Sequence, residues 1–205
     1  MSQTPIPTAE LEVVKQLKGV SIVFDVGART DIEYLSIFPK AEFHLFEPHA
    51  PFFEELKGLV GKKKKVHLNN IGLGNRVGKL MYSVGVQGFA GGEATSTGEI
   101  PYQIGTIDSY VNKHKVERID FLKIDTEGFD YKVLRGAKRT LSKIKYIQYE
   151  HWNDKEQFHK LLEPRFHLEY IGYRNVLCIN KKLVKKTELN KLVDFLIEGK
   201  YKELG

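Results

Sequence analysis

The sequence has a single cysteine, Cys178, among its 205 residues, and its apolar runs are all short. One cysteine excludes a disulfide framework and a zinc site built from cysteines. Short apolar runs exclude a membrane-spanning helix, which needs about 20 consecutive apolar residues. The segment from Met1 to Glu10 also lacks the basic start and the apolar stretch of a signal peptide. These absences predict a soluble, cytoplasmic protein that makes no contact with a membrane.

Hydrophobic residues make up 41% of the chain and aromatic residues 11%, which is enough for a sizeable core. The 32 basic residues exceed the 26 acidic ones, which gives a net charge of +6. This modest excess allows an anionic substrate or a nucleic acid but does not require one. The length predicts one domain over 1–205, with a core at about 20–183.

Short runs rich in β-branched and aromatic residues alternate along the chain with longer amphipathic stretches. Strands are predicted at 21–26, 41–46, 66–68, 78–84, 119–124, 144–149, 166–172 and 176–181. Helices are predicted at 8–18, from Thr30, from Pro51, and at 108–114, 129–141, 154–162 and about 187–199. The alternation favours an α/β fold, with a mostly parallel sheet and helices on both faces. The short gap between the last two strands predicts an antiparallel hairpin.

Three polar residues stand where predicted helices begin. Thr30 has Glu33 three positions further on, which is the spacing of a capping box. Asp108 and Thr187 are placed to cap the helices that start there. We therefore expect a side-chain cap at each of these three starts.

Polar side chains collect directly after the predicted strands. In a parallel sheet, ligands bind at the carboxyl ends of the strands. Asp25 and Gly27 end the first strand, and Glu47 ends the second, 20 residues after Gly27. An acidic residue at this distance is placed to accept both hydroxyls of a ribose. The joint spacing favours this interpretation over a solvated strand end.

The fourth and fifth core strands also end in acidic residues. Asp125 and Glu127 follow the run 119–124, and Glu150 and His151 follow 144–149. The pair Asp125 and Glu127 is suited to cap the next helix, to remove a proton, or to hold a divalent metal ion. No histidine-rich spacing indicates a transition metal. We interpret His44, His67 and His159 as surface or packing residues, and the lysine run 62–65 as a solvated approach to a strand.

The segment 86–98 is rich in glycine and small polar residues. Such a composition cannot bury much surface and predicts a mobile loop. Because the loop follows strand-like residues, we expect it to act as a lid on the substrate side of the site.

Several motifs together resemble one known family. These are VFDVGART, HLFEPHAPFFEEL, NNIGLGNRVGKL, TIDSYV, IDFLKIDTEGFDYKVLRGA and YIQYEHW, in this order. They resemble the FkbM-family methyltransferases, a branch of the S-adenosylmethionine-dependent Rossmann-like enzymes, over about 20–180. The resemblance implies a class I methyltransferase fold with seven strands and a final antiparallel hairpin. It also implies O-methylation, often of a hydroxyl on a sugar or another small molecule.

The resemblance also gives the site residues their roles. S-adenosylmethionine is the implied cofactor, and its binding is assigned to Asp25, Gly27, Ala28, Arg29, Glu47, Asn70, Ile71 and Asp125. Proton removal from the acceptor is assigned to Asp125, Glu127 and His151, and no metal site is assigned. The partner is a small-molecule hydroxyl acceptor, which includes the possibility of a glycan.

The turn after the first strand departs from the family pattern. The family usually continues with a small GAN turn and a further glycine, whereas this chain has Ala28, Arg29, Thr30 and Asp31 after Gly27. Arg29 is placed to pair with the carboxylate of the cofactor. The alternative is a weakened cofactor site, as in an inactive binding module with this fold.

Two other classes remain as alternatives. A nicotinamide-dependent dehydrogenase needs G-x-G-x-x-G after the first strand, and the run from Gly27 to Ile32 lacks the second and third glycine. A nucleic-acid methyltransferase is compatible with the positive charge. The sequence shows no interleaved basic and aromatic residues typical of an RNA-binding module, so we consider a nucleic-acid acceptor the weaker hypothesis.

Overall fold

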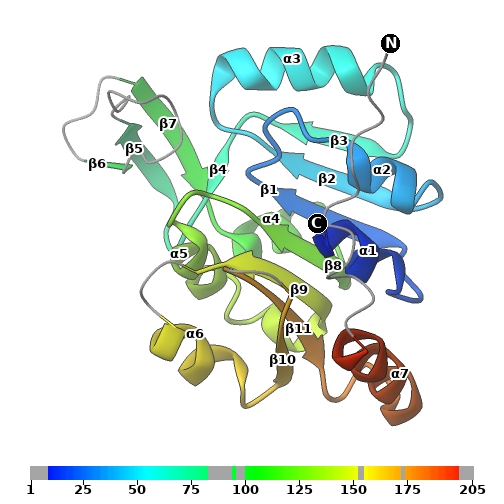
Figure 1. The fold of residues 1–205 in the computed structure, drawn as a ribbon. Helices are drawn as coiled ribbons and strands as arrows, with labels where there is room; N and C mark the ends of the chain where they lie inside the picture. The colour runs from blue at the N-terminus through cyan, green and yellow to red at the C-terminus, as the bar shows by residue number, and fades with distance from the viewer. Residues whose placement is uncertain (1–8, 83–93, 96–99, 152–154, 172–173, 199–205) are drawn as a thin grey trace.

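The fold is built on one seven-stranded sheet (Figure 1). The computed structural model describes residues 9–82, 94–95, 100–151, 155–171 and 174–198. The strands of the sheet, in spatial order, are β10 (Phe166–Tyr170), β11 (Asn175–Asn180), β9 (Ile144–Glu150), β8 (Ile119–Ile124), β1 (Ile22–Val26), β2 (Glu42–Phe46) and β3 (Val66–Asn69). Strand β11 runs antiparallel to both of its neighbours, and the other pairings are parallel. The predicted sheet and its final hairpin are confirmed.

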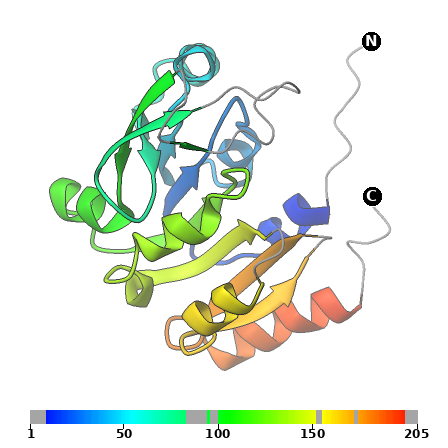
Figure 2. The same ribbon diagram turned by 90° about the vertical axis from the view of Figure 1, so that its left-hand side faces the viewer.

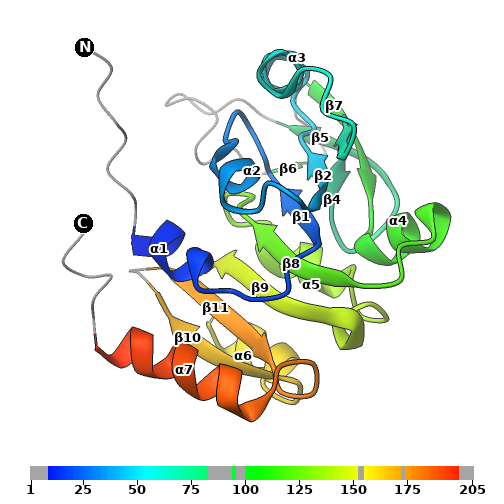
Figure 3. The ribbon, with the colours of Figure 1, turned by 90° about the vertical axis from the view of Figure 1, so that its right-hand side faces the viewer.

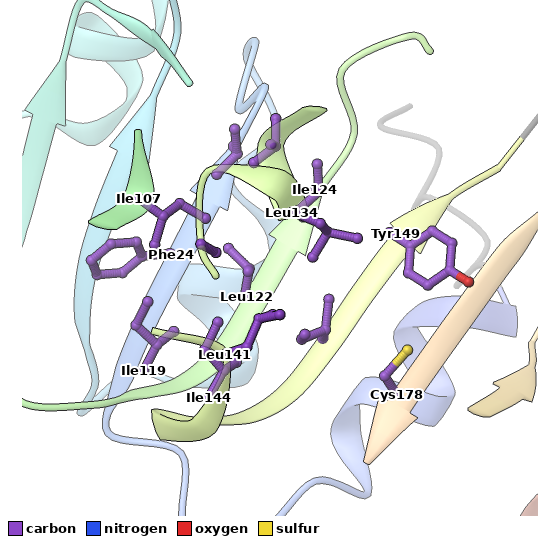
Figure 4. Packing of buried hydrophobic residues seen from close by; sticks show 14 of the residues in the cluster. Phe24, Ile107, Ile119, Leu122, Ile124, Leu134, Leu141, Ile144, Tyr149 and Cys178 are labelled. Carbon is purple, nitrogen blue, oxygen red and sulfur yellow. The ribbon is translucent and has the colours of Figure 1, made fainter. Parts of the chain in front are cut away.

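Helices cover both faces of this sheet, as predicted (Figures 2 and 3). One face packs against α1 (Ala9–Lys15), α2 (Glu33–Ile37), α3 (Ala50–Val60) and α7 (Lys186–Ile197). The other face packs against α4 (Ile107–His114), α5 (Asp130–Arg135), the short 3-10 helix η1 (Leu141–Lys143) and α6 (Lys155–Leu162). Figure 4 shows part of the second core, where Leu122 and Ile124 of β8 pack near Leu134 of α5.

Strand β8 lies in the middle of the sheet, and its residues suit a position buried on both faces. All six residues of β8 are buried, because helices cover both faces and strands flank both edges. Phe121 belongs to the core under α1 and α2, and Leu122 belongs to the core on the opposite face. This alternation is the two-residue repeat of a strand. The buried Asp120 accepts hydrogen bonds from the backbone N–H groups of Ser21 and Ile22, which anchors the start of β1.

A second, smaller sheet lies beyond the carboxyl ends of β1 and β2 (Figure 1). Its order is β4 (Gly72–Leu73), β7 (Ile100–Gly105), β5 (Gly78–Tyr82) and β6 (Ala94–Thr95). The sequence predicted a strand at 78–84 but not its partner β7. Of the predicted lid at 86–98, only Ala94 and Thr95 belong to the described residues, and the rest of that segment lies outside them.

The predicted side-chain caps are wrong at all three helix starts. Helix α2 begins at Glu33 rather than Thr30, and no side chain caps it. Helix α4 is capped by a box between Thr106 and Ser109 instead of by Asp108. Helix α7 begins at Lys186, before Thr187, and has no side-chain cap.

Two of the displaced caps have visible reasons. Arg29 adopts a left-handed conformation with φ of 47°, and the N–H of Asp31 donates to the carbonyl of Ala28. A turn therefore occupies the segment that was predicted as the first turn of α2. Asp108 accepts hydrogen bonds from the backbone N–H and the hydroxyl of Thr140, so it links α4 to the segment after α5.

Candidate active site

The site forms where the strand order of the sheet reverses. Strand β1 lies between β2 and β8. The chain adds β2 and β3 on one side of β1, and it adds β8 and β9 later on the other side. Open α/β sheets bind ligands at such a point, outside the carboxyl ends of the strands. The backbone N–H of Asp125 donates to the carbonyl of Val26. The backbone N–H groups of Gly27 and Ala28 both donate to the carbonyl of Phe46. The three strand ends are therefore tied together directly below the site.

The backbone conformation and the close approach of β8 both require a glycine at position 27. Its φ is 82°, in the region that favours glycine, and an added Cβ would lie 1.9 Å from the carbonyl oxygen of Asp125. No side chain fits between the ends of β1 and β8. The glycine that the sequence assigned to ligand contact is thus needed first for the close approach of two strands, and it also lines the cleft described next.

The first cleft has a volume of about 350 Å³ and opens at the ends of β1, β2 and β8. Its walls combine polar strand ends with apolar side chains from α3 and the small sheet. Its lining includes Gly27, Arg29, Asp31, Phe46, Glu47, Phe52, Leu73, Leu80, Tyr102, Ile104, Asp125, Glu127 and Phe129. The volume and the mixed lining are typical of a site for a small organic ligand.

Glu47 is held in a fixed orientation in this cleft. Its carboxylate accepts hydrogen bonds from the backbone N–H groups of Arg29, at 2.9 Å, and His49, at 2.7 Å. Burial raises the pKa of Glu47, and the two hydrogen bonds act in the opposite direction. Each carboxylate oxygen keeps a further lone pair for a ligand. Glu47 therefore presents a fixed carboxylate to the first cleft, and its contact with a ribose stays a prediction.

The other residues assigned to the cofactor fall into two groups. Arg29 lines the first cleft and stacks over the ring of Phe52, with 4.9 Å between the guanidinium carbon and the ring centroid. Asp25 and Ala28 are buried and line neither cleft. Asn70 also lines neither cleft, and its amide donates to the carbonyls of Glu47 and Pro48. It supports the turn that carries Glu47.

Ile71 packs against the core instead of the cleft, and the next two residues line the cleft in its place. Gly72 and Leu73 form the short strand β4, which joins the small sheet. The prediction for this segment was therefore close in sequence but displaced by one or two residues, because β3 continues to Asn69.

A second cleft of about 470 Å³ adjoins the first. It is lined mainly by polar residues: Glu10, Asp31, Glu33, Tyr34, Lys123, Asp125, Glu127, Gln148, Glu150, Arg174 and Asn175. Asp31, Asp125 and Glu127 line both clefts. Three carboxylates thus stand at the boundary between a cleft with apolar walls and a cleft with polar walls.

The acidic side chains at this boundary perturb one another. Burial raises the pKa of Glu127, and the neighbouring Asp125 raises it further. Burial and then the charges of Asp125, Asp130 and Glu127 raise the pKa of Glu150 to about 7, while Arg174 opposes the shift. A carboxylate with a pKa near neutrality is suited to accept a proton at physiological pH. A cation bound at this boundary would be favoured by the same charges.

Asp125 and Glu127 reach the same boundary by a route that the sequence did not predict. Strand β8 ends at Ile124, so its extended geometry does not continue to Glu127, which has a φ of 52° in the left-handed region. The turn, rather than strand geometry, brings both side chains to the clefts. His151 is buried with its ring edge toward Tyr170 and lines neither cleft, and Trp152 lies outside the described residues.

Asp130 organises this acidic turn. One of its carboxylate oxygens accepts hydrogen bonds from the backbone N–H and the hydroxyl of Thr126, and the other accepts the backbone N–H of Glu150 at 2.9 Å. Asp130 therefore links the loop that carries Asp125 and Glu127 to the strand that carries Glu150. Burial raises its pKa to about 6. Sequence reasoning assigned no role to Asp130, although an acid at the start of a helix is a common signal.

Lys123 is the second residue that sequence reasoning missed. It is 5% exposed and lies on β8 below the boundary of the clefts. Its ammonium nitrogen is 3.3 Å from a carboxylate oxygen of Asp25 and 3.6 Å from one of Asp125. The signal was a lysine in the run from Ile119 to Ile124, which is apolar except for Asp120 and Lys123, since a lysine is rarely buried without a partner.

Comparisons with known proteins agree with the fold and show the family. The model of the methyltransferase FkbM domain matches residues 25–175. The chain is 22% identical to the 2-O-methyltransferase NoeI of Sinorhizobium fredii over 192 residues, which cover 80% of this chain and 79% of NoeI.

Two solved structures show the same fold. A putative rRNA-methylase from Clostridium thermocellum superposes with a TM-score of 0.52 at 8% identity, over 88% of this chain and 97% of that one. A putative methyltransferase from Streptococcus mutans, solved with S-adenosylhomocysteine, gives a TM-score of 0.50 at 12% identity, over 87% of this chain and 97% of that one.

The fold and the clefts define a Rossmann-like methyltransferase of the S-adenosylmethionine-dependent class. The chain belongs to the FkbM methyltransferase family. Among the residues that the structure describes, no helix is both long and apolar enough to cross a membrane.

Proposed function

We propose that this protein transfers a methyl group from S-adenosylmethionine to a hydroxyl of a polar small molecule, with a sugar as the favoured acceptor. The observation that carries the proposal is the boundary between the two clefts. Asp31, Asp125 and Glu127 line both, so a group in one cleft and a group in the other would meet beside these carboxylates. A transfer reaction needs such a shared boundary.

The first cleft fits the cofactor. Glu47, oriented by two backbone N–H groups, has free lone pairs for the ribose hydroxyls. Phe46, Phe52 and Ile104 offer apolar surface for the adenine ring. The bound cofactor supplies a methyl group on a positively charged sulfur. The negative carboxylates at the boundary favour binding of the positively charged cofactor over binding of the product, whose sulfur is neutral.

The second cleft fits the acceptor. Its lining is rich in carboxylates and amides, which bind hydroxyl groups through hydrogen bonds. Holding the acceptor oxygen in line with the methyl group is the main contribution of the protein to such a displacement. We assign removal of the hydroxyl proton to the acidic group formed by Asp125, Glu127 and Glu150, with Glu150 as the acceptor of the proton because its pKa is raised to about 7.

His151 has a different place in this proposal. Its ring is buried and lines neither cleft, so it acts through Glu150, its neighbour in the chain, and not on the acceptor. Its backbone N–H donates to the carbonyl of Arg174, a residue of the second cleft. We therefore propose that His151 positions the end of β9.

One fact supports oxygen as the methyl acceptor, and another argues against a nucleic acid. The relative from Sinorhizobium fredii is named as a 2-O-methyltransferase. The second cleft is lined by six acidic residues against Lys123 and Arg174, and an acidic cleft repels a phosphate backbone. The similarity to a putative rRNA-methylase shows the fold alone.

The proposal is tested with methyl-labelled S-adenosylmethionine and a panel of acceptors. The panel contains mono- and oligosaccharides, a phenol and a short RNA, and mass spectrometry locates the added methyl group. We expect label on a sugar hydroxyl, reduced about 10²-fold or more in the Glu127→Gln variant and unchanged in Glu54→Gln, an exposed residue of α3. Transfer to RNA alone, or to a nitrogen atom, would contradict the proposal.

A further inference from the structure

Three residues outside the linings of the two clefts converge on one face of the sheet. Glu42 and His44 are two positions apart in β2, so their side chains point to the same face. His67 of β3 stands directly opposite His44 in the register of the two strands. None of the three lines either cleft. The register, and not any spacing in the sequence, brings them together.

The side chains of these residues meet at their polar ends. One carboxylate oxygen of Glu42 lies 3.3 Å from Nε2 of His44 and 3.0 Å from Nε2 of His67. One possible ligand atom from each residue lies within 4.8 Å of the others. In the absence of an ion, Nε2–H of His67 donates a hydrogen bond to Glu42, and loss of that proton leaves three lone-pair donors around one small volume.

His44 gives a second, independent indication of a ligand. The residue is 3% exposed, and its Nε2 makes no hydrogen bond despite being buried. Its other nitrogen, Nδ1, lies 2.9 Å from the hydroxyl of Tyr110. When Nδ1 carries the proton and donates it to Tyr110, Nε2 presents a bare lone pair to the carboxylate of Glu42. In that tautomer two lone pairs face each other, and a cation between them relieves the repulsion.

We propose that Glu42, His44 and His67 bind one divalent transition-metal ion, for which Zn²⁺ is the suitable probe. Two imidazoles and a carboxylate are a donor set that Zn²⁺ accepts, and three protein ligands leave a position for water. Tyr110 serves as the outer partner that fixes the tautomer and orientation of His44. His44 packs in the core and His67 lies at the surface, as predicted from the sequence, and the proposal adds a role in binding.

The site needs one local adjustment when it binds the ion. The rings of His44 and His67 are stacked, with 18° between their planes and 4.6 Å between their centroids, so their lone pairs run nearly parallel. The side chain of His67 is 48% exposed and is free to turn toward the ion, whereas His44 is fixed by Phe24 and Tyr110. The ion would join the edge strand β3 to β2, which stabilises the fold and does not take part in methyl transfer.

The experiment uses the full chain without a histidine tag. Zn²⁺ is titrated by calorimetry, and the melting temperature is measured with and without the ion. We expect one ion per chain and a rise of about 5–10 °C at 100 times the dissociation constant for a domain of this size. Glu42→Gln and His67→Ala should each weaken binding by at least about tenfold. Both replace partly exposed residues, so the variants should fold.

The matched control is His159→Ala. His159 also pairs with a glutamate, Glu163, at 2.7 Å, but no second histidine belongs to that pair in the described part of the chain. This control should bind Zn²⁺ as the unmodified protein does, and Mg²⁺ should not replace Zn²⁺. Absence of Zn²⁺ binding, or equal binding by Glu42→Gln and His67→Ala, would overturn the proposal. The test is independent of methyl transfer.

Discussion

The ammonium nitrogen of Lys123 lies 3.3 Å from a carboxylate oxygen of Asp25, and both residues are at least 95% buried. Burial raises the pKa of Asp25, and the charge of Lys123 opposes this shift. The pair lies below Asp125, whose carboxylate is 3.6 Å from the same ammonium group. Lys123 thus compensates one buried and one partly exposed carboxylate at the end of β1 and β8.

Removing one member of this pair should strongly destabilise the fold. In Lys123→Met, Asp25 keeps a buried carboxyl group without its counter-charge, and we expect a loss of about 3–5 kcal/mol in the free energy of unfolding. The double variant Asp25→Asn with Lys123→Met should lose less than the sum of the two single variants. Urea denaturation measures both effects.

The control for this prediction is an exposed ion pair. Lys57 and Glu54 on α3 are 3.1 Å apart and well exposed, so Lys57→Met should cost less than about 1 kcal/mol. Equal losses for Lys57→Met and Lys123→Met would show that the buried pair has no special role.

Glu47→Gln should weaken binding of S-adenosylmethionine and S-adenosylhomocysteine alike, because both carry the ribose. Hydrogen bonds to a charged group contribute about 1.5–3 kcal/mol, so we expect at least a tenfold loss of affinity by calorimetry. The amide is chosen over alanine because Glu47 also holds the N–H groups of Arg29 and His49. Glu54→Gln should bind as the unmodified protein does, and equal affinities for all three proteins would remove the ribose assignment.

Substitutions of Asp125 and Glu127 should differ in their effects on cofactor affinity. Asp125 lies beside Lys123 and lines both clefts, so Asp125→Asn should lower turnover about 10²-fold or more and also weaken cofactor binding. Glu127 is exposed on the turn, so Glu127→Gln should lower turnover and leave cofactor affinity nearly unchanged. Steady-state kinetics with calorimetry measures this difference. Full turnover in both variants would leave these acids with a structural role only.

Glu150 should make stability depend on pH in a definite direction. Its pKa rises from 4.5 to about 7 on folding, so between these values the folded chain holds the proton more tightly than the unfolded chain. Its contribution therefore lowers stability as pH rises from 4.5 through 7, and the loss remains above pH 7. Glu150→Gln removes this loss because the amide does not ionise.

We therefore expect Glu150→Gln to melt about 2–4 °C above the unmodified protein at pH 8, the response to ~1 kcal/mol after solvent screening of a partly exposed group. At pH 5 the difference should be close to zero. Glu156→Gln, on the exposed start of α6, should show no such dependence. A difference for Glu150→Gln that is the same at both pH values would contradict the assigned shift.

The fold could be predicted from the sequence because its signals are local. The buried runs from Ile22 to Val26 and from Ile119 to Ile124 alternate with amphipathic stretches, and this alternation defines a parallel sheet. The predicted cap at Thr30 was wrong because capping depends on which backbone groups a turn has already used. Thr30 has the right spacing to Glu33, but the left-handed Arg29 places a turn there instead.

The site could be predicted in part, and the missing residues share a physical reason. Glu47, Asp125 and Glu127 follow strands directly, so strand ends located them. Lys123 acts through partners on other strands, and its role depends on the pairing of β1 with β8.

Two further features depend on long-range pairing. Asp130 is linked to Glu150 across 20 positions, and His44 meets His67 only through the register of β2 and β3. A single sequence carries no direct signal for such contacts.

The central claim is that the cleft with Glu47 holds the cofactor and that its reactive end meets Asp125 and Glu127. A crystal structure with S-adenosylhomocysteine tests this most directly. The account predicts the ribose hydroxyls within hydrogen-bond distance of Glu47, the adenine between Phe46 and Ile104, and the sulfur at the boundary of the two clefts. A ligand bound elsewhere, or a ribose without contact to Glu47, would contradict it.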